Sequence, residues 1–167
     1  MNSQVESDRM NRILNELSQD LNTMMLNSEQ NESTLNDKLK QLQERMISVM
    51  RTNCSEAFNW FEKNKFNLKE TQATPEAAKY MRELQECASR FDYGLRGEMM
   101  NAEREMNSLN NNHNSCTQNC MADQSNDDAS IKVCLKRCFS ATFERTSSLQ
   151  QNLSKKVDEV IFNLNKI

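Results

Sequence analysis

The chain has 167 residues, of which 37% are apolar, and a net charge of -3; with a mean hydropathy of -0.85, it cannot bury a thick globular core. Its two glycines and one proline exclude a fold with many tight turns, because these residues supply most sharp reversals. Both signs of charge are interspersed and no basic cluster is interleaved with aromatic residues, so we expect no nucleic acid partner.

These limits, together with many strong helix formers and no run of β-branched residues, predict an all-α protein. We expect three long antiparallel helices that form two disulfide-stapled helical hairpins with coiled-coil-like packing. The apolar stretches are far shorter than the roughly 20 residues that cross a bilayer, so membrane attachment is expected to be peripheral rather than spanning. Residues 1–10 contain acidic side chains and no apolar segment, so we expect entry into an organelle without a cleaved presequence.

The first predicted helix has an apolar seam in steps of three and four residues, which is typical of heptad packing. Two polar residues, Ser28 and Asn31, interrupt the seam, and we interpret this as one long helix with a soft spot, or a loop, between Asn27 and Ser33. The face then continues toward Cys54 and an aromatic stretch that ends near Phe66. The predicted seam residues are Met10, Leu14, Leu17, Leu21, Met24, Leu35, Leu39, Leu42, Met46 and Val49.

The second predicted helix starts at Pro75 with Thr74 as its N-cap, after a reversal of the chain between Lys69 and Thr74. Gly94 and Gly97 interrupt it and permit either a bend or a close helix contact, since each costs about 1 kcal/mol relative to alanine. We expect the helix to resume or persist to about Met121. Its apolar positions are Tyr80 or Met81, Leu84, Cys87, Phe91, Leu95, Ala102, Met106 and Leu109.

The third predicted helix follows a loop from Asp123 to Ser130, in which Asp127, Asp128 or Ser130 could serve as the N-cap. Its apolar residues continue at steps of mostly three and four to the end of the sequence. They are Ile131, Cys134, Leu135, Cys138, Phe139, Leu149, Leu153, Val157, Val160, Ile161 and Leu164.

Four of the six cysteines form two CxxxC pairs, separated by thirteen residues. Residues four apart lie on one face of a helix, so each pair presents two sulfurs to a partner helix that runs the other way. Antiparallel pairing then joins outer to outer and inner to inner, which predicts Cys116 bonded to Cys138 and Cys120 bonded to Cys134. The alternative use of these thiols is a tetrahedral zinc site, although zinc sites usually use shorter spacings.

The two remaining cysteines show an incomplete version of the same spacing, in which an apolar residue stands where the outer cysteine would be. Cys54 is preceded by Met50 and Cys87 is followed by Phe91, each at a distance of four. We predict a bond between Cys54 and Cys87, with Met50 and Phe91 in apolar contact at the outer position.

The segment from about Asn114 to Lys156, and above all VCLKRCF from Val133 to Phe139, resembles the small Tim proteins of the mitochondrial intermembrane space. A closer overall resemblance is to the family with sequence similarity 136, in which two such cysteine hairpins occur in tandem, and the N-terminal forty residues have no counterpart in it. The resemblance implies import as a reduced chain, oxidation by the intermembrane-space disulfide relay, and residence between the mitochondrial membranes. Stable disulfides also need an oxidising compartment.

These observations divide the chain into an N-terminal helical extension (1–40), a degenerate first cysteine hairpin (41–110) and a twin CxxxC hairpin (111–167). Trp60, with its neighbours Phe58 and Phe61, is either the apolar end of the first hairpin or an anchor for a partner. His113, the single histidine, has no carboxylate near it in sequence, and we interpret it as an exposed bystander.

We therefore expect a non-catalytic protein without a cofactor or metal. The favoured function is an accessory subunit or assembly scaffold of a respiratory complex, peripheral on the intermembrane-space face of the inner membrane, with protein subunits of that complex as partners. The alternative is a chaperone for hydrophobic precursors like the small Tim proteins. Length favours the first, because a small Tim subunit is a single hairpin of about half this size.

Overall fold

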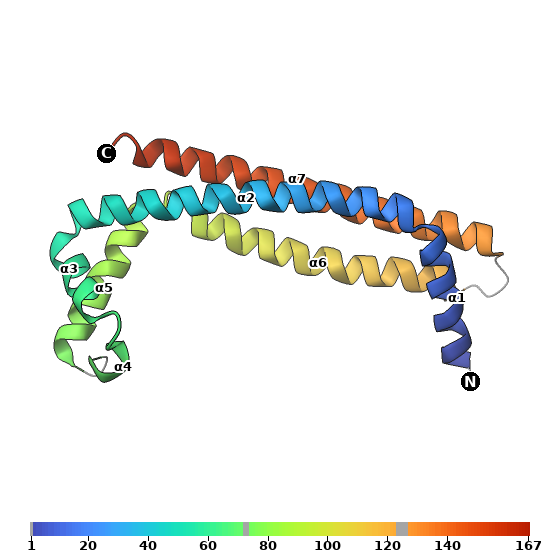
Figure 1. Ribbon diagram of the computed structural model, residues 1–167, viewed down its shortest axis with the longest axis horizontal. Coiled ribbons are helices and arrows are strands. Elements are labelled where there is room, and N and C mark those ends of the chain that lie inside the picture. The colour runs from blue at the N-terminus through green and yellow to red at the C-terminus, as the bar shows by residue number, and fades with distance from the viewer. Residues whose placement is uncertain (1, 72–73, 123–126) are drawn as a thin grey trace. The chain divides into compact units, whose positions relative to one another are not determined.

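In the computed structural model, residues 2–71, 74–122 and 127–167 are described. Within these ranges the chain is all-α, as predicted, and contains no strand (Figure 1). None of the helices in this part of the chain is both long enough and apolar enough to cross a membrane. The helices are α1 (Asn2–Glu16), α2 (Ser18–Asn53), α3 (Ser55–Asn64), α4 (Leu68–Thr71), α5 (Pro75–Arg90), α6 (Leu95–Ala122) and α7 (Asp128–Leu164).

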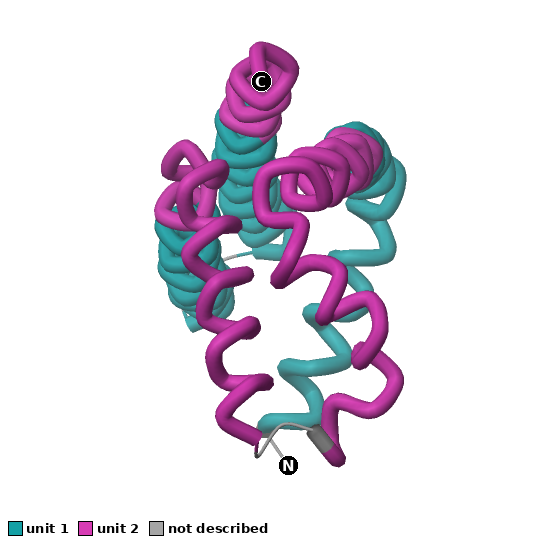
Figure 2. The backbone as a smooth tube through the Cα atoms, turned by 90° about the vertical axis from the view of Figure 1, so that its left-hand side faces the viewer, with its two compact units in different colours: residues 1–35, 99–153 teal, residues 36–98, 154–167 magenta. Residues whose placement is uncertain are grey.

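The chain divides into two compact units, each assembled from two segments (Figure 2). Unit 1 comprises Met1–Leu35 and Met99–Leu153, and unit 2 comprises Asn36–Glu98 and Ser154–Ile167. Helices α2, α6 and α7 therefore contribute residues to both units. The boundaries expected from the sequence followed the chain in order, whereas each unit joins segments that are distant in sequence.

The first long helix is interrupted at Leu17 rather than between Asn27 and Ser33. Backbone hydrogen bonds continue through the interruption, because the Leu17 N–H donates to the Ile13 carbonyl at 3.1 Å. Helix α2 is unbroken from Ser18 to Asn53. The polar seam position at Asn31 is satisfied within unit 1, where its side-chain amide donates to Ser147 Oγ at 2.9 Å. Because its amide has this hydrogen-bond partner, the half-buried Asn31 is accommodated within a continuous helix.

The second long helix, expected to persist to about Met121, is divided into α5 and α6 next to Gly94, the first of its two glycines. Helix α5 ends at Arg90 and α6 begins at Leu95, and between them Tyr93 and Gly94 adopt positive φ angles of 49° and 81°. Gly94 therefore makes a bend. Gly97 is not at a close helix contact, since no atom from outside its own stretch of helix lies within 4 Å of the position that its Cβ would occupy.

The predicted caps of the later helices are present. Thr74 Oγ1 accepts from the Ala77 N–H at 3.1 Å at the start of α5, and Asp127 Oδ1 accepts from the Ser130 N–H at 2.7 Å at the start of α7. The loop expected between Asp123 and Ser130 is shorter than predicted, because α7 begins at Asp128. Residues 123–126 of that loop lie outside the described ranges, as do residues 72–73 of the expected reversal.

Unit 2 packs the end of α7 against α2. Val157, Val160 and Leu164 are fully buried. Lys38 pairs with Asp158 at 2.6 Å, and the Arg45 guanidinium donates to the Leu164 carbonyl at 3.0 Å. The Leu164 carbonyl also accepts from the Ile167 N–H at 3.2 Å, so the arginine is a second donor at the end of α7.

Candidate functional site: the disulfide-stapled hairpins

The twin CxxxC motifs lie on α6 and α7 and face each other in unit 1. Cys116 is bonded to Cys138 and Cys120 to Cys134, with Cα–Cα separations of 5.9 Å and 5.7 Å. Both separations fall within the usual range for a disulfide. The bonds join the pairs that the spacing predicted, since antiparallel helices bring outer to outer and inner to inner.

The four sulfurs of these bonds form one group. Cys120 Sγ lies 3.6 Å from Cys138 Sγ, which belongs to the other disulfide. The sulfurs of Cys116, Cys120 and Cys138 all lie within 4.8 Å of one another. Zinc binds thiolates rather than disulfide sulfurs, so a metal site here would require reduction of both bonds.

The N-terminal helices cover the two disulfides between α6 and α7, Cys116–Cys138 and Cys120–Cys134, which we call the staples. Ile13 and Leu17 share one apolar core with the hairpin, and Met10 and Leu21 pack against it. The other buried members of this core are Cys120, Ile131, Leu135 and Cys138. Residues assigned from sequence to the extension and to the twin hairpin therefore form a single core within unit 1.

Ion pairs fix the register and direction of this contact. On the N-terminal helices Arg12, Glu16 and Asp20 are spaced by four residues, and they pair in order with Asp128, Lys132 and Lys136 on α7. Partners that rise together in number show that the two segments follow the same direction, and Figure 1 shows α2, which carries Asp20, running alongside α7 in that direction. Exposed pairs of this kind add little stability individually, but an antiparallel or shifted arrangement would break all three.

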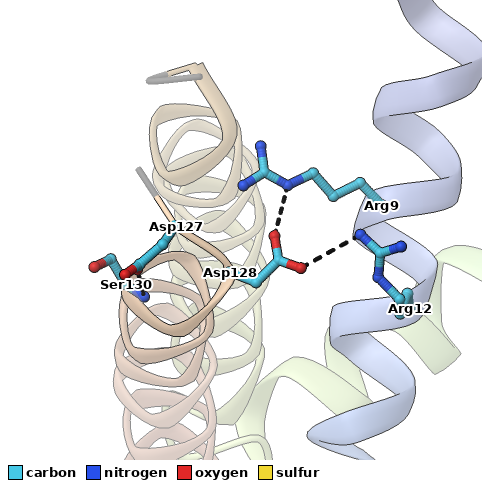
Figure 3. Close-up of polar contacts among 5 residues, drawn as sticks. All are labelled: Arg9, Arg12, Asp127, Asp128 and Ser130. Carbon is cyan, nitrogen blue, oxygen red and sulfur yellow. Dashed lines mark hydrogen bonds and ion pairs between the residues drawn. The ribbon is translucent and has the colours of Figure 1, made fainter. Parts of the chain in front are cut away.

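Asp128 is the most strongly held residue of this series (Figure 3). Arg9 Nε donates to Asp128 Oδ1 at 2.8 Å, and Arg12 Nη2 donates to Oδ2 at 3.3 Å. The hydrogen bond from Arg9, helped by the charges of both arginines, lowers the pKa of Asp128 below its ordinary value. The neighbouring cap lowers the pKa of Asp127 as well, through its hydrogen bonds with Ser130.

We expect the attachment of α1 to weaken in acid. A carboxylate whose pKa is lowered by folding stabilises the folded state above its unfolded pKa of about 4, and this contribution is lost as the pH falls through the lowered value. Asp128→Asn should therefore speed hydrogen exchange of α1 amides at neutral pH, and its difference from the wild type should shrink in stronger acid. Asp8→Asn changes an exposed acid on the same helix and serves as the control. Equal exchange in Asp128→Asn and wild type at neutral pH would contradict the prediction.

The first hairpin, in unit 2, is closed by one disulfide between Cys54 and Cys87, as predicted, with a Cα–Cα separation of 6.4 Å. Cys54 is the N-cap residue of α3, and Cys87 on α5 is fully buried. Arg90 Nη2 lies 3.8 Å from Cys54 Sγ. Met50 packs against the core of Ala57, Phe58 and Leu84. Its predicted contact with Phe91 stays a prediction.

The structure places the three aromatic residues predicted to bind a partner in different environments. Phe58 is only 5% exposed and belongs to the core of the first hairpin. Phe61 packs against that core, and Trp60 stacks on Tyr80 with a centroid separation of 5.5 Å. A partner at this surface would meet the half-exposed Trp60 and Phe61 rather than Phe58. The Tyr80 hydroxyl donates to Glu56 at 3.0 Å, and this hydrogen bond raises the pKa of Tyr80.

His113 is not an exposed bystander. Its ring meets Phe139 edge-on, with centroids 4.6 Å apart, and its Nδ1 lies 2.8 Å from Thr142 Oγ1. Because the Thr142 hydroxyl already donates to the Cys138 carbonyl, its oxygen accepts from His113 Nδ1–H. The histidine therefore helps to hold α6 against α7 next to the staples.

These features define an all-helical protein with disulfide-stapled hairpins, an architecture compatible with that of twin CxxxC proteins. Comparison of the chain with models of protein families, with curated proteins and with solved structures finds no significant match.

Proposed function

We propose that the chain is a non-catalytic structural subunit or assembly scaffold of a respiratory complex, peripheral on the intermembrane-space face of the mitochondrial inner membrane. The observation that supports this proposal is that the N-terminal helices bury the apolar face of the twin hairpin. Ile13 and Leu17 fill the apolar face beside the staples. A chaperone that holds hydrophobic precursors needs such a surface to be accessible, whereas a scaffold needs it buried and rigid.

The cysteines support the proposed location. All six are paired in disulfides, and stable disulfides require an oxidising compartment. The resemblance of VCLKRCF to the small Tim proteins, and of the tandem hairpins to the family with sequence similarity 136, points to the intermembrane space and to oxidation by its disulfide relay. The first hairpin departs from that tandem pattern because it keeps only the inner pair, Cys54 and Cys87.

The alternative function is a small Tim-like chaperone in the same compartment. The observation that favours it is a set of accessible methionines in unit 1, Met25, Met99 and Met100, each more than two-fifths exposed. Flexible methionine side chains suit surfaces that adapt to varied apolar partners. The chaperone would bind precursors there, away from the covered face of the hairpin.

Native separation of gently solubilised mitochondria distinguishes the two functions. The scaffold proposal expects the chain to co-migrate with a respiratory complex at a fixed stoichiometry, as measured by mass spectrometry across the size fractions. Recovery in a species of small ring size, or together with carrier precursors, would support the chaperone and overturn the scaffold.

A further inference from the structure

The turn between α3 and α4 carries a local charge opposite to that of the whole chain. Residues 63–69 read KNKFNLK, with three lysines and no acid, whereas the chain has a net charge of -3. We call these seven residues the α3–α4 tip. At its centre Phe66 is 87% exposed, more than any other large apolar side chain in the described part of the protein.

Hydrogen bonds fix the turn that presents Phe66. The Asn67 N–H donates to the Asn64 carbonyl at 2.9 Å, and the Glu70 N–H donates to the Asn67 carbonyl at 3.0 Å. The Asn64 side chain donates to the Trp60 carbonyl at 2.8 Å and ties the turn to α3. The backbone therefore holds the ring away from the core formed by Ala57, Phe58 and Leu84.

One of the three lysines around this ring has an ion-pair partner, and Glu62 and Glu70 flank the tip in sequence. Lys65 Nζ lies 5.3 Å from the centroid of the Phe66 ring and pairs with Glu62 at 3.0 Å. Lys63 and Lys69 are exposed, and neither forms an ion pair with the residues that the structure describes. A single exposed phenylalanine is ordinary. Phe66, however, combines an exposed apolar ring with neighbouring lysines on a turn held by hydrogen bonds. An apolar side chain and positive charge are the two features that bind an anionic membrane surface.

We propose that the α3–α4 tip contacts the anionic surface of a lipid bilayer. Phe66 enters the headgroup region, and Lys63, Lys65 and Lys69 face the lipid phosphates. A bilayer suits this convex tip better than a protein does, because lipids accommodate one projecting ring and mobile ammonium groups without a shaped pocket. The proposal is independent of which complex the chain joins, and it supplies a site for peripheral membrane attachment.

Trp60 provides the measurement, since it is the only tryptophan and lies on α3 beside the tip. The oxidised full-length protein is mixed with phosphatidylcholine vesicles, with and without phosphatidylglycerol, and with brominated chains in a matched set. We expect the anionic vesicles to shift Trp60 emission to the blue and the brominated chains to quench it. Each phosphate-facing lysine contributes about fivefold to such binding, so Lys63→Gln with Lys69→Gln should weaken it by more than tenfold.

Phe66→Ser should abolish the quenching while the helix content stays unchanged, because the ring contributes nothing to the core. Phe162→Ser is the matched control. Phe162 is also exposed, at 62%, and has Lys166 over its ring at 4.2 Å, but it lies on α7. Figure 1 shows this end of α7 apart from the tip beside α4.

Equal binding to neutral and anionic vesicles, or normal quenching in Phe66→Ser, would overturn the lipid contact. So would a Phe66→Ser protein that binds vesicles normally but no longer co-migrates with a respiratory complex, because the tip would then bind protein. Loss of vesicle binding with co-migration intact supports the lipid contact and leaves the proposed function standing.

Discussion

Replacing Cys54 and Cys87 together by alanine should destabilise the protein more than removing either twin disulfide. The bond between them spans 33 residues and is the only disulfide of unit 2. The chain-entropy relation gives about 4 kcal/mol for a loop of this length and about 3 kcal/mol for the shorter loop closed by Cys120 and Cys134. Denaturant unfolding followed by circular dichroism measures the change in the free energy of unfolding in each variant, and Trp60 fluorescence follows the first hairpin separately.

The matched variant replaces Cys120 and Cys134 by alanine. There the neighbouring bond between Cys116 and Cys138 remains and still closes the α6–α7 hairpin, so the measured loss should be below the value for an isolated loop. The first hairpin has no such second bond. A larger loss in the Cys120/Cys134 variant would show that the twin bonds do not support each other.

The sequence predicted the elements that repeat with a period. Steps of three and four located the long helices, and the spacing of four within each CxxxC motif placed both sulfurs on one helix face. Antiparallel pairing then left one arrangement of the twin bonds. Caps were equally predictable, because Thr74 before Pro75 and Asp127 before α7 satisfy backbone donors through contacts within one turn.

Features set by long-range packing could not be predicted in this way. Ile13 is fully buried, whereas the seam was assigned to its neighbour Leu14, which is half-buried. The sequence does not show which of two adjacent apolar residues on a helix is buried, because the position of the partner helix decides it. The interruption at Leu17 has no glycine or proline beside it, and Leu17 itself is buried in the core of the staples.

The same distinction explains the tip and the parallel contact. Phe66 continues the apolar period of the first hairpin in sequence, but α3 ends at Asn64 and the following turn directs the ring into solvent. The pairs from Arg12 to Asp128 and from Asp20 to Lys136 join segments more than one hundred residues apart. Surface charges alternate too often along this chain for a single sequence to indicate which of them meet.

Ile13→Asp should detach α1 from the twin hairpin without opening the hairpin. Ile13 is completely buried, and an unpaired charge at such a site costs several kcal/mol. The chain avoids this cost by undocking α1, because the two disulfides hold α6 against α7 whether or not α1 is present. We expect α1 amides to exchange at least about 100-fold faster, which corresponds to about 2.7 kcal/mol of lost protection.

Asn15→Asp is the matched control, since it adds the same charge at an exposed position of the same helix. The detached variant also tests the function, because it uncovers the apolar face beside the staples. If that face were a chaperone surface regulated by α1, Ile13→Asp would keep a carrier precursor soluble better than the wild type does. A scaffold whose own helix completes its core gains no such activity, and the uncovered protein should itself associate and lose its place in the complex.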